Sequence, residues 1–111
     1  MDKLLANITI SIQTYRDLGD RLSFNDTVEL SAIMKNLSSD LFFLEKHRDS
    51  ASRKHNSILH SHISEGSAVS KAEIIANEQC PELYMLRRIM TSAYKTLDAI
   101  RSNISFLKQE R

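Results

Sequence analysis

The stretch LYMLRRIMTSAYKTLDAIRSNISFL, residues 83–107, decides the fold because its apolar and small side chains recur at alternating spacings of three and four. This spacing places one stripe along a helix, which is buried best against another helix by knobs-into-holes packing. The stripe, here called the C-terminal seam, consists of Leu83, Leu86, Met90, Ala93, Leu97, Ile100, Ile104 and Leu107. It predicts a coiled-coil-like C-terminal helix and an interface between copies of the chain, while antiparallel pairing within one chain remains a second possibility.

Composition supports long helices throughout the chain. Its 111 residues leave room for one domain, and two glycines, one proline and no tryptophan provide few turn signals. Long segments with periodic Leu, Ile, Ala and Met side chains are typical of helices. The sequence therefore predicts an all-α protein, a long helical hairpin preceded by a shorter N-terminal helix, which associates into oligomers.

Helix boundaries divide residues 1–111, expected to form a single helical domain, into three parts. Residues 1–25 hold an N-terminal helix, from about Asp2 to Leu18, and a link; Gly19 suits the position just after that helix. Residues 26–65 form a long helix that opens on a capping box made by Asp26 and Glu29. Residues 66–111 contain a turn and the C-terminal helix.

Two local signals shape this last part. Ser70 and Glu73 have the spacing of a second capping box, after a turn at Gly66. Pro81 either kinks the helix or starts a new one at its first position. Traced backwards past the proline, the heptad frame of the seam passes through Gln79, Ala76 and Ala72.

Cys80 is the lone cysteine, so no disulfide can form within the chain, and a reducing cytoplasm is the natural setting. Its place before Pro81 is typical of a helix boundary. No histidine or basic residue lies within three positions of it, so a reactive thiol is not expected.

Positive charge is concentrated in two segments, although the whole chain has a formal net charge of only +1. Residues 46–64 carry four basic and one acidic side chain, and residues 83–111 carry six basic and two acidic ones. Such side chains neutralise phosphates without reading bases, and Tyr84 or Tyr94 would stack on unpaired bases. The candidate nucleic-acid-binding residues are Lys46, Arg48, Arg53, Lys54, His55, Arg87, Arg88, Lys95 and Arg101. The same charges also fit an ordinary solvated helix face.

Other kinds of site have little support. His47, His55, His60 and His62 are not spaced four apart, so no metal site is predicted. There is no glycine-rich phosphate loop and no context for a Ser-His-Asp arrangement, so neither catalysis nor a cofactor is expected.

The segment Leu97-Asp98-Ala99-Ile100-Arg101-Ser102 resembles the C-terminal helix of the UvsY-type recombination mediators of tailed phages, and Leu44-Glu45-Lys46-His47 resembles their middle segment. The resemblance covers residues 40–108. It implies a ring-forming protein that binds single-stranded DNA without sequence preference. It also implies that the protein helps to load a RecA-like recombinase onto strands covered by single-strand-binding protein. Carried over, Arg48, Arg53 and Lys54 fall in the part that resembles the DNA-binding region. The part that resembles the oligomerisation helix contains Leu83, Leu86, Met90, Leu97, Ile100 and Ile104.

The expected location is the cytoplasm, that of the host if a phage encodes the protein. No stretch approaches the ~20 apolar residues that cross a bilayer, so no membrane partner is expected. The alternative function is a phage-encoded helical module that docks on a host enzyme and inhibits it, without binding nucleic acid.

Overall fold

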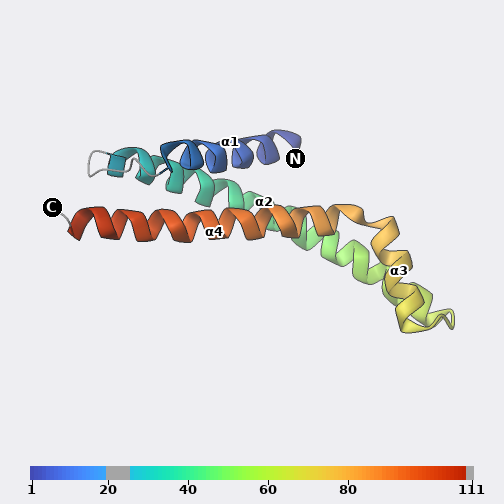
Figure 1. Cartoon of the computed structure of the whole chain (residues 1–111). Coiled ribbons are helices and arrows are strands. Elements are labelled where there is room, and N and C mark those ends of the chain that lie inside the picture. Colours follow the sequence, from blue (N-terminus) through green and yellow to red (C-terminus); the bar gives the residue numbers. More distant parts are fainter. Residues whose placement is uncertain (20–25, 110–111) are drawn as a thin grey trace. The chain divides into compact units, whose positions relative to one another are not determined.

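The chain is all-α, as predicted. The computed structural model describes residues 1–19 and 26–109. Within these ranges it contains four helices and no strand: α1 (Asp2–Leu18), α2 (Thr27–Ser64), α3 (Val69–Gln79) and α4 (Pro81–Gln109) (Figure 1). Most of the predicted link lies outside the described residues.

Both ends of α1 are where the sequence places them. The helix stops at Gly19, which adopts a φ of 51° and donates its backbone N–H to the carbonyl of Tyr15. A side chain at this φ would be strained, so glycine suits this C-terminal position. The second helix begins at Thr27, directly after the predicted cap residue Asp26.

The prediction of a second capping box, at Ser70 and Glu73, is wrong. Helix α3 already begins at Val69, and Ala68 is its N-cap, without a side-chain hydrogen bond. Ser70 therefore lies inside the helix. The preceding turn is closed by the backbone instead: Gly66, at a φ of 98°, donates its N–H to the carbonyl of Ile63 over 3.0 Å. Because backbone hydrogen bonds hold this turn, the start of α3 does not depend on the Ser-x-x-Glu spacing.

Pro81 begins a new helix rather than kinking an old one. Helix α3 ends at Gln79, and Cys80 has non-helical angles, φ −135° and ψ 61°. The heptad frame of the seam predicts that Gln79 is buried. Because the chain leaves the helical path at Cys80, Cys80 is buried instead and Gln79 is exposed. Proline at a first helical position loses no hydrogen bond, since its N–H would have no partner there.

Contacts divide the described chain into two compact units. Unit 1 contains residues 1–44 and 89–111, and unit 2 contains residues 45–88. In unit 1, α1 and α4 run in one direction and the first part of α2 runs in the other (Figure 1). All three contribute to one apolar cluster, formed by Leu30, Ile33, Ile100 and Leu107 with Tyr15, Leu18, Met34 and Ile104 against it. The Asn103 amide also donates a hydrogen bond to the Tyr15 hydroxyl.

Unit 2 is built from the second part of α2, from α3 and from the first turns of α4. Its buried side chains are mostly small: Ala51, Ala72, Ala76 and Cys80, joined by Leu83 and Leu86. Small side chains allow neighbouring helix backbones to approach closely.

The C-terminal seam has a different role from the predicted interface between copies. Seven of its eight members are at most 3% exposed within a single chain, and Ile104 is partly buried. The sequence pattern does not show that, in unit 1, side chains of α1 and α2 pack against the part of the stripe that contains Ile100, Ile104 and Leu107. The seam is therefore core, and an assembly of several copies would need a different surface.

Candidate nucleic-acid interface

The nine predicted nucleic-acid-binding residues are divided between the units. Lys95 and Arg101 belong to unit 1. The other seven belong to unit 2: Lys46, Arg48, Arg53, Lys54 and His55 on α2, and Arg87 and Arg88 on α4. Unit 2 therefore contains most of the candidate interface.

A hollow lies where α3 ends and α4 begins. It has a volume of about 470 Å³ and is lined by Asn77, Cys80, Pro81, Leu83, Tyr84 and Arg87. We call it the junction hollow. On either side of the non-helical residue Cys80, α3 and α4 run in different directions (Figure 1).

Tyr84 and Arg88 are exposed neighbours on the first turns of α4. Tyr84 is 69% exposed, and the guanidinium carbon of Arg88, one helical turn later, lies 5.8 Å from the centre of its ring. Cations at this distance are attracted to the face of an aromatic ring. An exposed ring beside two arginines, Arg87 and Arg88, provides both a stacking surface for a base and cations for phosphates.

His55 connects α2 to the same junction. Its Nε2 lies 2.8 Å from Oδ1 of Asn77, one of the residues that line the hollow. Because an amide oxygen only accepts, His55 is the donor in this bond. The NH₂ group of Asn77 is then the part left for a ligand. Nothing in the sequence pattern singled out Asn77, because its role depends on the helix packing.

Lys54 is paired with a carboxylate. Its Nζ lies 3.4 Å from Oε1 of Glu82, which also accepts a hydrogen bond from the Cys80 thiol over 3.2 Å. The pKa of Glu82 is lowered, first by its own backbone N–H in the opening turn of α4, then by the thiol and by Lys54. Lys54 thus offers less charge to a phosphate than the sequence suggests.

The thiol of Cys80 is protected by its surroundings. The side chain is 2% exposed, and its Sγ also lies 3.4 Å from the carbonyl oxygen of Ala51. Burial raises the pKa of this thiol, and the hydrogen bond and negative charge of Glu82 raise it further. The reactive thiolate is therefore disfavoured in the folded protein.

We expect iodoacetamide to alkylate Cys80 more slowly in the native protein than in the urea-unfolded chain at the same pH, because folding both buries the thiol and raises its pKa. Mass spectrometry of timed samples measures both rates. Equal rates would mean that the junction opens readily in solution.

The remaining candidates are surface residues. Arg48 pairs with the neighbouring Asp49 at 3.1 Å, and Arg101 pairs with Asp98 at 3.5 Å. Exposed pairs of this kind contribute only about 0–1 kcal/mol, so either arginine can exchange its partner for a phosphate. Arg53 and Lys95 are exposed.

The histidines do not gather into a metal site. His62 lies 4.0 Å from Glu65, and His55 is bonded to Asn77. Among residues 1–19 and 26–109, no group of three or more His, Cys, Asp or Glu side chains is placed to hold a metal ion.

Two further findings concern the whole described chain. None of its helices combines the length and apolar character needed to cross a membrane. Comparison with family models, with curated proteins and with solved structures finds no match for this chain.

Proposed function

We propose that this protein binds single-stranded DNA without sequence preference, through the face of unit 2 that carries the junction hollow. The observation that supports this most directly is the exposed ring of Tyr84 with Arg88 against it and Arg87 beside it. Stacking of bases on aromatic side chains tolerates any base, since every base has a π-face.

The binding mode follows from the chemistry of these groups. One unpaired base stacks on Tyr84, while Arg87 and Arg88 neutralise the phosphates on either side of it. Arg53, on the exposed side of α2, adds a further cation. Bases within a duplex are already stacked on one another, so this mode favours single strands.

Fluorescence anisotropy with a labelled single-stranded oligonucleotide tests the proposal. With two to three neutralised phosphates, the affinity for a single strand falls by about 7- to 20-fold when salt rises fourfold, from about 50 to about 200 mM. A duplex of equal length is the control and is expected to bind more weakly. No binding at about 50 mM salt would reject the proposal, and equal affinity for the duplex would reject the stacking of bases on Tyr84.

The resemblance to UvsY-type mediators suggests a role for this binding. In that role the protein, as an oligomer, helps a RecA-like recombinase to replace single-strand-binding protein on DNA. Several copies on one strand would add avidity to weak individual contacts. Because the C-terminal seam is buried, the copies would meet through other residues.

A loading assay tests this role separately. A RecA-like recombinase is added to DNA covered by single-strand-binding protein, and its ATP hydrolysis is followed with and without this chain. A mediator shortens the lag before hydrolysis begins. An unchanged lag, together with confirmed DNA binding, would limit the function to DNA binding alone.

The alternative, a helical protein-interaction module, is favoured by a different observation. Phe42 and Phe43 on α2 are 59% and 50% exposed, with ring centres 5.6 Å apart. Exposed aromatic side chains are enriched at protein interfaces. This alternative becomes the leading one if the oligonucleotide does not bind at low salt.

A further inference from the structure

A row of exposed side chains runs along α4 beside the buried C-terminal seam. Each member of this row directly follows a seam residue in the sequence, and every such residue is exposed. We call it the outer row. Tyr84 and Arg87 belong to it in the first turns of α4. Within unit 1 it consists of Thr91, Tyr94, Asp98, Arg101, Ser105 and Lys108.

Tyr94 is the aromatic member of the outer row in unit 1. Its side chain is 42% exposed, and the neighbouring Lys95 is also exposed. Arg101 and Lys108 follow Tyr94 at spacings of seven, which return to the same side of a helix after two turns. The sequence leaves open which of Tyr84 and Tyr94 stacks on a base, whereas the structure exposes both. An exposed ring in line with cations is the combination that binds a single strand.

From this arrangement we propose that Tyr94 is a second base-stacking site for single-stranded DNA, located in unit 1. Because it takes the same ligand, this site rests on the proposed function. A second unpaired base stacks on Tyr94, while Lys95 and Arg101 neutralise phosphates next to it. A strand long enough to occupy both rings therefore gains about one or two phosphate contacts, each of which steepens the slope of log affinity against log salt by about 0.7.

Asp98 is the acidic member of the outer row, and its charge is balanced by a neighbour. Its Oδ1 lies 3.5 Å from Nη1 of Arg101, and both side chains are exposed. An exposed pair of this kind contributes little to stability, so a phosphate can replace the carboxylate as the partner of Arg101. Asp98 thus lowers the affinity of the site without blocking it.

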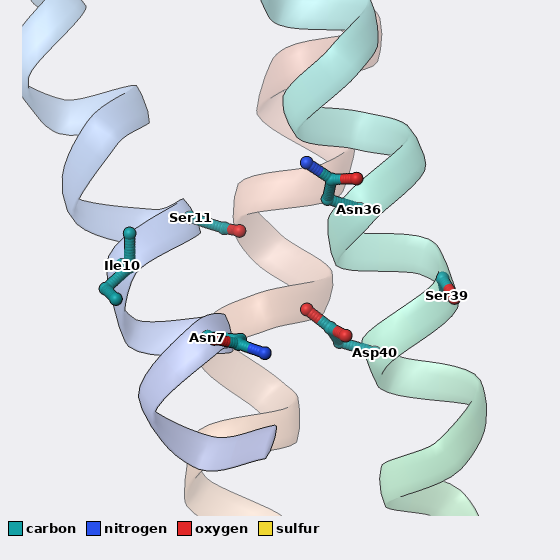
Figure 2. Close-up of a pocket in the computed structure, with 6 residues that line it drawn as sticks. All are labelled: Asn7, Ile10, Ser11, Asn36, Ser39 and Asp40. Carbon is teal, nitrogen blue, oxygen red and sulfur yellow. The ribbon is translucent and has the colours of Figure 1, made fainter. Parts of the chain in front are cut away.

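The hollow between α1 and α2 offers DNA no comparable surface in unit 1. It has a volume of about 300 Å³ and is lined by Asn7, Ile10, Ser11, Asn36, Ser39 and Asp40 (Figure 2). This lining contains neither an aromatic ring nor a basic side chain, and its ionisable group is the carboxylate of Asp40, which repels phosphates. Within unit 1, the outer row is the surface that matches a single strand.

Tyrosine fluorescence tests the second site directly, because the chain has three tyrosines and no tryptophan. Tyr84→Phe keeps a stacking ring at the junction but removes its tyrosine emission. The remaining emission comes from Tyr94 and from Tyr15, which is partly buried against the apolar cluster. Adding oligothymidylate of about 16 nucleotides to this variant is expected to quench up to about half of the emission in a saturable manner, since a base stacks on Tyr94 alone.

The double variant Tyr84→Phe with Tyr94→Phe is the matched control. It keeps both rings, and its emission comes from Tyr15, so it measures the loss that is due to absorption of light by the DNA. Anisotropy of the labelled oligonucleotide is followed in parallel. Binding with equal quenching in both variants would refute the site at Tyr94 and leave the junction site intact, whereas no binding to either variant would refute both.

Tyr94→Ala measures what the second ring contributes to affinity. We expect about fivefold weaker binding of the same oligonucleotide, at the lower end of the range for a stacked aromatic side chain, because Tyr94 is less exposed than Tyr84. Phe106→Ala is the matched control: Phe106 is 59% exposed on the same helix but lies outside the outer row. Equal weakening by both variants would contradict specific stacking on Tyr94.

Asp98→Asn provides a gain of function that loss of folding cannot imitate. It releases Arg101 for a phosphate and is expected to strengthen binding about two- to fivefold. Asp17→Asn is the matched control, since it removes the same charge from an exposed site on α1, where Asp17 accepts a hydrogen bond from Gln13. An equal gain in both variants, or no gain in Asp98→Asn, would mean that the strand does not pass Arg101 and would overturn the proposal.

Discussion

Replacing Leu97 with aspartate is expected to unfold unit 1, rather than to separate copies of an intact chain. Leu97 is 3% exposed within one chain, in the middle of the α4 segment that unit 1 contains. Losing a buried leucine costs about 1.5–3 kcal/mol, and leaving a charge buried without a partner costs a further ~3–5 kcal/mol. The sum is comparable to the whole stability of a small domain, about 5–15 kcal/mol.

Urea unfolding followed by circular dichroism measures this effect. Ser102→Asp is the matched control, because it adds the same charge at an exposed position of the same helix and is expected to change the free energy of unfolding by about 0.5 kcal/mol or less. Leu97→Ala is expected to cost about 2–5 kcal/mol and to leave a folded protein whose transition can be measured.

Protein concentration separates an intrachain core from an interface between copies. The unfolding midpoint of a chain that is stable by itself does not depend on concentration, whereas that of an obligate oligomer rises with it. If Leu97→Asp kept native helicity and only lowered the mass measured by light scattering, the C-terminal seam would join copies after all.

How far the sequence alone predicts this fold depends on whether a feature is local. Gly19 marks the end of α1 and Pro81 the start of α4, because each acts through its own backbone angle. The spacing of Ser70 and Glu73 gave a wrong start for α3, because a cap residue acts only where the chain enters the helix, and the N-cap is Ala68, two residues earlier, after the turn at Gly66.

The partner of an apolar stripe is not encoded locally. The period of the C-terminal seam predicts that it is buried against another helix, but that helix can belong to the same chain or to another copy. The stripe at Leu30, Leu37 and Leu44 on α2, each 0% exposed, supplies that neighbour. A second apolar stripe in the same chain is the sequence signal that would have favoured burial of the seam within one chain over an interface between copies.

The candidate interface likewise combines features that are local in the sequence with features that depend on helix packing. Charge density singled out Arg87 and Arg88, and their place on one helix followed from the sequence. The junction hollow did not follow, because it depends on the non-helical angles of Cys80 and on Asn77, which α3 brings within 2.8 Å of His55. Likewise, Lys54 and Glu82 are 28 positions apart in the chain, so the local density of charge does not show that Lys54 is paired with a carboxylate.

Single-stranded DNA binding is expected to depend on Tyr84 more than on any other one side chain. Tyr84→Ala removes the stacking surface, which is worth about 1–3 kcal/mol per base, and so lowers affinity by roughly 5- to 150-fold. Tyr84→Phe keeps the ring and is expected to bind within about threefold of the parent chain. Tyr84 is exposed, so neither change should affect folding.

Reversing both arginines, Arg87→Glu with Arg88→Glu, is expected to alter the salt dependence in addition to the affinity. Each phosphate contact on a single strand contributes about 0.7 to the slope of log affinity against log salt, so two lost contacts flatten it by about 1.4. The matched control, Arg16→Glu with Lys35→Glu, changes the net charge equally at exposed positions in unit 1. Equal weakening by both pairs would mean that overall charge attracts the DNA, whereas an unchanged slope in the first pair would place the phosphates away from the junction hollow.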